Sequence, residues 1–108
     1  MNFACWNIQG LNTPGKQREV NHLISVNFLT LCVIVESHVH TNSFNSVCRS
    51  SFGRWSWVSN LGYSDRGARI IIAWDLNVLE LMVLEVHAQF MHCQIKIRGG
   101  SVSFAIQI

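Results

Sequence analysis

Two polar residues follow apolar runs at positions where a ligand could be bound. Asn7 ends an apolar run near the start of the chain, and Glu36 follows a longer one, residues 29–35. If both runs are parallel strands, the two side chains lie at the carboxyl edge of the sheet, where α/β proteins gather their ligand sites. A carboxylate and an amide oxygen suit a hard cation, so the pair predicts magnesium rather than zinc. Asn and Glu also serve as ordinary turn and capping residues after strands, which is the competing interpretation.

Other candidate residues surround this pair in the sequence. Glu36, His38 and His40 alternate, so an extended backbone would place all three on one face, as a transition-metal site requires. No fourth ligand is nearby in the sequence, and we favour a polar loop after a buried strand. Arg66 and Arg69 flank a glycine and are a candidate contact for nucleic-acid phosphates, although arginines in a hairpin turn are usually only solvated.

The first half of the chain has the pattern of a strand, a helix and a second strand. Residues 2–8 are apolar and aromatic, and turn formers follow them. Apolar positions recur at helical spacing between residues 16 and 27, which predicts an amphipathic helix. Residues 29–35 form a continuous apolar run of strand length, typical of a strand buried on both faces. This order predicts a parallel crossover.

The second half has a different pattern. A short helix is predicted from residue 44 to about residue 52, and strand-like runs separated by turn formers follow at residues 54–59, 68–74, 78–85, 89–97 and 101–108. Successive hairpins are the simplest interpretation. The last run ends without a covering element, so an apolar edge would stay open. The sequence therefore predicts one α+β unit with a mixed sheet, which we expect to be cut in mid-fold.

Composition limits the other possibilities. A chain of 108 residues is long enough for one core, and its net charge of +2 is too small to identify a polyanionic partner. The four cysteines form no C-x-x-C pair, which predicts free thiols in a reducing compartment and no disulfide partner. The start of the chain lacks the pattern of a signal peptide, and its richest apolar run is far shorter than the roughly 20 residues of a membrane span. We expect an intracellular protein, nuclear or cytoplasmic, with no membrane contact.

Three blocks of sequence resemble a known superfamily. Residues 5–12 (CWNIQGLN) with 16–20 (KQREV) are similar to the opening motif of retrotransposon endonucleases, and residues 31–39 (LCVIVESHV) are similar to the strand that ends in their metal-binding glutamate. Residues 67–75 and 89–93 resemble the hairpin strands that follow. The chain therefore resembles the N-terminal part of the endonuclease/exonuclease/phosphatase (deoxyribonuclease-I-like) superfamily, most closely the endonuclease domains of plant non-LTR (LINE-type) retrotransposons.

The resemblance implies a fold, a reaction and a set of site residues. The fold would be a four-layer α/β/β/α sandwich, of which residues 1–108 would be a partial domain without its C-terminal half. The reaction would be hydrolysis of DNA phosphodiester bonds in the complete domain, with Mg²⁺ or with Mn²⁺ in its place. Asn7 would be the catalytic residue that positions the metal or the phosphate, and Glu36 would bind the metal. The later catalytic residues would lie beyond Ile108, in some relatives followed by a reverse transcriptase, so the chain alone is predicted to be inactive.

The chain also departs from this family. Gln9 stands where the family commonly has a basic residue, and Ser37 and His38 stand where it has threonine and lysine. Loss of positive charge beside a phosphate would weaken substrate binding. Two alternatives therefore stay open: a non-catalytic remnant or interaction module, and part of a phosphatase or abasic-site endonuclease of the same fold.

Overall fold

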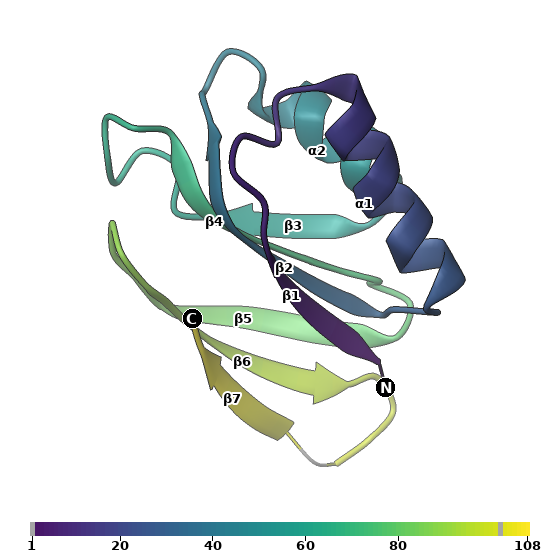
Figure 1. The fold of residues 1–108 in the computed structure, drawn as a ribbon. Helices are drawn as coiled ribbons and strands as arrows, with labels where there is room; N and C mark the ends of the chain where they lie inside the picture. The colour runs from purple at the N-terminus through teal and green to yellow at the C-terminus, as the bar shows by residue number, and fades with distance from the viewer. Residues whose placement is uncertain (1, 102) are drawn as a thin grey trace.

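The computed structural model describes residues 2–101 and 103–108, which form two sheets and two helices (Figure 1). The first sheet has four strands in the order β1-β2-β4-β3, and the second has three in the order β5-β6-β7. The elements in chain order are β1 (Phe3–Asn7), α1 (Pro14–Val26), β2 (Leu31–Val39), α2 (Phe44–Phe52), β3 (Ser56–Ser59), β4 (Ala68–Trp74), β5 (Leu79–Val86), β6 (Met91–Ile97) and β7 (Ser103–Gln107).

The layers are helices, mixed sheet and antiparallel sheet. Both helices cover one face of the first sheet, and the second sheet packs on its other face (Figure 1). The chain therefore has an α+β fold, and its three layers fit part of the expected four-layer sandwich. In the part of the chain that the structure describes, no helix covers the outer face of the second sheet, where Met82 and Leu84 are half-exposed.

The parallel start of the chain is confirmed. Helix α1 begins after Thr13, whose side chain accepts a hydrogen bond from the backbone N–H of Lys16, and Pro14 occupies its first turn. The helix buries Val20 and returns the chain so that β1 and β2 pair in parallel, with Asn7 opposite Val35. The helix therefore starts two residues before the predicted position.

Strand β2 lies inside the first sheet and is buried on both faces, as its continuous apolar run predicted. Cys32 and Ile34 face the helices, whereas Leu31 and Val33 face the second sheet. The expectation that this strand stops at Val35 is wrong, because β2 continues to Val39 after an irregularity.

The expectation of successive hairpins is wrong at one point. Strands β3 and β4 form a hairpin, and β5, β6 and β7 form two more. The turn after β4, however, carries the chain from the first sheet to the second. The N–H of Asp75 donates to the carbonyl oxygen of Thr30 at 2.9 Å, so this turn is anchored to the start of β2 while β5 departs.

The cysteines are free thiols. Cys32, Cys48 and Cys93 are buried as small apolar residues, and Cys5 is exposed. Burial raises the pKa of Cys32 and of Cys48 to about 12, so both are protonated at neutral pH. Neither helix in the described residues is long and apolar enough to cross a membrane.

Candidate functional site

A polar hollow opens at one end of the molecule, where the two sheets meet. It has a volume of about 360 Å³ and is lined by Glu36, His38, Ser64, Arg66, Arg69, Ala88 and Gln89. These residues come from β2, the segment before β4, β4 itself and the turn between β5 and β6. Three of the charged candidates from the sequence thus lie around one cavity.

Glu36 is the carboxylate of this hollow, and both of its oxygens have partners. Arg69 Nε donates to Oε1 at 2.8 Å, and His38 Nε2 lies 3.0 Å from Oε2. The Glu36 side chain is 25% exposed, so it is partly shielded from solvent. The hydrogen bond from Arg69, with the charges of Arg69 and His38, lowers the pKa of Glu36 against the opposing effect of desolvation. The carboxylate is therefore ionised at neutral pH.

A bulge in β2 aims Glu36 at the hollow. Val35 pairs with Ile70 and Val39 pairs with Ala68, so β2 has two extra residues in this interval. Glu36 and His38 both have positive φ, 60° and 51°. The glutamate that was expected to end the strand therefore lies within it, and His38, expected in a loop, is a strand residue in contact with Glu36.

The bulge is held from both sides. On one side, the N–H groups of Gly10 and Leu11 donate to the carbonyl oxygens of Glu36 and Ser37. On the other, the buried hydroxyl of Ser37 donates to the carbonyl oxygen of Ala68. Gly10 and Leu11, part of the opening motif singled out in the sequence, therefore lie against the backbone that presents Glu36.

Gly67 also fits tightly against the bulge. It has φ +80°, and a Cβ built on it would lie 2.7 Å from the carbonyl oxygen of Val39. Since real side chains do not approach a backbone oxygen so closely, this position requires glycine. The glycine between the two candidate arginines thus serves close packing of β4 on the bulge.

Asn7 lies at the same end of the sheet but lines a different depression. It is exposed at the end of β1, opposite Val35, and so one position along β2 from Glu36. The depression that it lines has a volume of about 340 Å³ and includes Lys16 and Glu19 of α1. Within the described residues no hydrogen bond joins Asn7 to Glu36, and sharing of a ligand by the two stays a prediction.

The two arginines have different settings. Both line the hollow, but Arg69 is held by Glu36. Among the described residues, Arg66 is bonded only through its backbone N–H, which donates to the Ser64 hydroxyl. His40 is exposed beyond the end of β2. Among residues 2–101 and 103–108 no group of three or more His, Cys, Asp and Glu side chains could hold a metal ion.

The donor set of the hollow fits one position of a hard-cation site. Magnesium is commonly held by one or two carboxylates and keeps several waters. Each carboxylate oxygen can accept more than one hydrogen bond or ligand, so the contacts of Glu36 do not exhaust its capacity. Of the described lining residues, Glu36 alone is a carboxylate, and it could hold a cation only weakly by itself.

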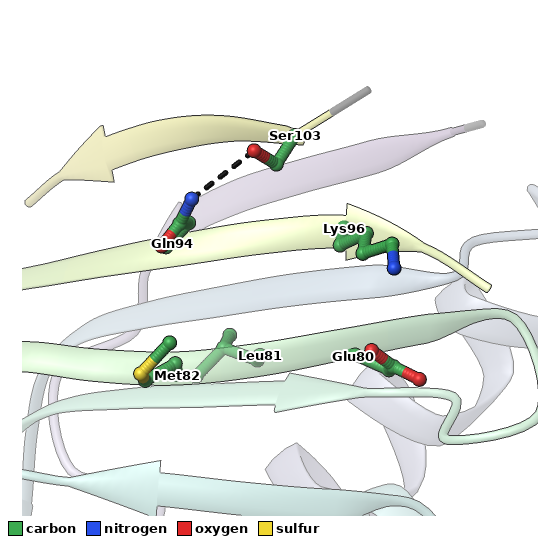
Figure 2. A pocket seen from close by; sticks show the side chains of 6 residues that line it. All are labelled: Glu80, Leu81, Met82, Gln94, Lys96 and Ser103. Carbon is green, nitrogen blue, oxygen red and sulfur yellow. Dashed lines mark hydrogen bonds between the residues drawn. The ribbon is translucent and has the colours of Figure 1, made fainter. Parts of the chain in front are cut away.

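A second depression is less suited to chemistry. It has a volume of about 320 Å³ and lies on the outer face of the second sheet, between Glu80, Leu81, Met82, Gln94, Lys96 and Ser103 (Figure 2). Gln94 donates to Ser103 there, while Glu80 pairs with Arg98 at 3.1 Å. Its lining is a sheet face with one half-exposed carboxylate, so we assign the candidate site to the Glu36 hollow.

Comparisons with known proteins bear on the fold. No protein-family model and no curated protein matches the sequence. Among solved structures, the chain is similar to a functionally unknown conserved protein from Enterococcus faecalis V583, with a TM-score of 0.66 and 16% identity over 99% of this chain. It is also similar to the human Nocturnin catalytic domain with bound sulfate anion, with a TM-score of 0.53 and 11% identity over 94% of this chain.

The chain shares the fold of the matched part of each structure. The likeness supports the α+β arrangement of helices and two sheets as the fold of this chain. The chain spans about half the length of both structures, 51% and 47%. At these identities the likeness concerns the fold, and activity has to be argued from the residues of the hollow.

Residues that the sequence did not single out also belong to the site. Ser64 and Gln89 line the hollow, and buried Asn60 lies beside it. Gln89 comes from the second sheet, and nothing in its local sequence distinguishes it from an ordinary turn residue. A buried polar side chain is recognised only once the surrounding fold is known.

Proposed function

We propose that this chain forms one side of the active site of a magnesium-dependent phosphodiester hydrolase, most closely a retrotransposon-type DNA endonuclease. The observation that carries the proposal is the ionised, partly shielded Glu36 at a hollow between the two sheets. The fold that holds it is similar to part of the Nocturnin catalytic domain. Structural ion pairs also occur on protein surfaces. This one is held on a bulged strand beside a cavity, a common setting for functional carboxylates.

The residues have separable roles in this proposal. Glu36 would hold Mg²⁺, with Mn²⁺ as the alternative, and Asn7 would position the metal or the phosphate from the neighbouring strand. The bound metal would polarise a phosphoryl oxygen and stabilise charge on the leaving oxygen. Arg66 has a side chain available to contact a DNA phosphate, whereas Arg69 keeps Glu36 ionised and oriented.

Metal titration of the chain tests the proposal. Mg²⁺ should shift the NMR signals of Gln89 and Arg69, and Mn²⁺ should broaden the same signals because it is paramagnetic. Glu36→Gln keeps the shape of the side chain but removes its charge, so both effects should disappear. His38→Ala is the matched control, since it removes the other partner of Glu36 and should leave binding in place. Metal effects that persist in Glu36→Gln, or that vanish only in His38→Ala, would overturn the assignment of the ligand.

A further inference from the structure

Asn60 is a fully bonded polar side chain inside the protein. It is 1% exposed and directly follows β3. Its Oδ1 accepts from the backbone N–H groups of Arg69 and Ile70, both at 2.9 Å. Its Nδ2 donates to the carbonyl oxygens of His87 at 3.2 Å and Ala88 at 2.9 Å. A primary amide offers two donors and can accept twice, so all four capacities are used.

These four bonds join the two sheets beside the hollow. Arg69 and Ile70 belong to β4 of the first sheet, whereas His87 and Ala88 lie in the turn between β5 and β6 of the second. Arg69 carries the guanidinium that holds Glu36, and Ala88 lines the hollow from the second sheet. The amide of Asn60 thus links both walls of the cavity through one rigid group.

We propose that Asn60 is a positioning residue that fixes the two walls of the Glu36 hollow relative to each other. The proposal rests on the proposed function in so far as the hollow is a metal and phosphate site. A buried amide with four bonds has no rotational freedom, and any shift of β4 against the β5–β6 turn would break at least one of them. The orientation of Arg69, and through it that of Glu36, depends on this link.

Two substitutions separate the halves of the link. Asn60→Asp keeps an oxygen that accepts from Arg69 and Ile70, but it places a second carboxylate oxygen against the carbonyls of His87 and Ala88. It should release the second sheet and preserve the bonds to β4. Asn60→Ala removes both halves and leaves buried N–H and C=O groups without partners.

The matched control is Asn21→Ala. Asn21 is an exposed asparagine of α1 whose Nδ2 donates to the carbonyl oxygen of buried Ser51 of α2 at 3.3 Å. It does not line the hollow. Its loss measures the general effect of deleting one asparagine amide contact in this fold.

The experiment measures amide hydrogen exchange and Mg²⁺ binding under conditions in which every variant is folded. Asn60→Asp should speed exchange at residues 87–90 more than at residues 69–70, and Asn60→Ala should speed both. Mg²⁺ affinity should fall in Asn60→Ala by less than the roughly 10- to 100-fold that follows loss of a group bonded directly to a metal ligand, because Asn60 acts on Glu36 through Arg69. Asn21→Ala should change neither quantity locally.

The outcomes separate this inference from the proposed function. If the unchanged chain binds no Mg²⁺, the proposed metal site fails, and the exchange pattern alone decides whether Asn60 links the walls. Uniform loss of protection along the chain in both Asn60 variants would overturn the inference. The inference would also be overturned if the unchanged chain binds Mg²⁺ and the Asn60→Ala variant binds it as tightly as the Asn21→Ala variant does.

Discussion

Substitution of Gly67 by alanine tests the packing that presents Glu36. Gly67 has φ +80°, and an added Cβ would lie 2.7 Å from the carbonyl oxygen of Val39 and 3.0 Å from its carbonyl carbon. Both atoms are backbone, so no side chain can rotate away to make room. The start of β4 would have to move from the bulge, and with it the strand that carries Arg69.

The expected loss in the free energy of unfolding of Gly67→Ala has a conformational part and a steric part. A second glycine separates the two. Gly99 has φ +81°, and a Cβ there would meet nothing within 4 Å. Gly99→Ala therefore reports the conformational cost alone, roughly 1–2 kcal/mol. Gly67→Ala adds forced overpacking of about 1–3 kcal/mol, for a total loss of about 2–5 kcal/mol in the free energy of unfolding.

Urea unfolding of the two variants and the unchanged chain provides the measurement. The difference between Gly67→Ala and Gly99→Ala isolates the steric contact, because the backbone conformations match within one degree of φ. Equal losses of free energy in the two variants, within about 0.5 kcal/mol, would refute the reasoning. The close approach of residue 67 to the bulge would then have no energetic role.

The ion pair, the hollow and the thiols each lead to one further test. Arg69→Met should lower the free energy of unfolding at pH 7 by about 0.5–1 kcal/mol, since both side chains are partly solvated. Because Arg69 lowers the pKa of Glu36, the contribution of this ion pair to the free energy of unfolding is lost as the pH falls through the lowered pKa. A difference between Arg69→Met and the unchanged chain that persists in acid would contradict this. With Mg²⁺ and supercoiled plasmid, the purified chain should leave the DNA intact, because the described lining offers one carboxylate; nicking that Glu36→Ala abolishes would refute this. Iodoacetamide at pH 8 should label exposed Cys5 before Cys32 and Cys48, whose pKa is raised to about 12, and equal labelling by mass spectrometry would contradict their burial.

Periodicity predicted the elements of this fold because each depends on its own local residues. The apolar positions of residues 16–27 follow the helical period, and α1 forms there. Residues 68–74 were predicted as a strand and form β4 with the same bounds. The continuous apolar run before Glu36 predicted burial on both faces, and the helices and the second sheet supply those two faces.

The arrangement of the site could not be predicted in the same way, because it depends on contacts between distant residues. Glu36 and Arg69 are 33 residues apart, and the bonds of Asn60 to His87 and Ala88 span 27 and 28 residues. The sequence placed Glu36 after a strand, since polar residues normally follow a buried run. The bulge keeps Glu36 in the strand because the partner strand resumes pairing at Ala68, and a single sequence contains no pattern for that register shift.

The strain at the bulge gives an independent reason to regard Glu36 as functional. Three non-glycine residues in the described chain have positive φ, and two of them, Glu36 and His38, lie in this bulge. Such conformations cost on the order of 1–3 kcal/mol each and persist only where the surroundings enforce them. Here the Gly10 and Leu11 amides and the Ser37 hydroxyl supply that enforcement. A regular strand would avoid this cost. The bulge therefore costs stability at a residue that lines the hollow, and this supports the proposed role of Glu36 in binding a ligand.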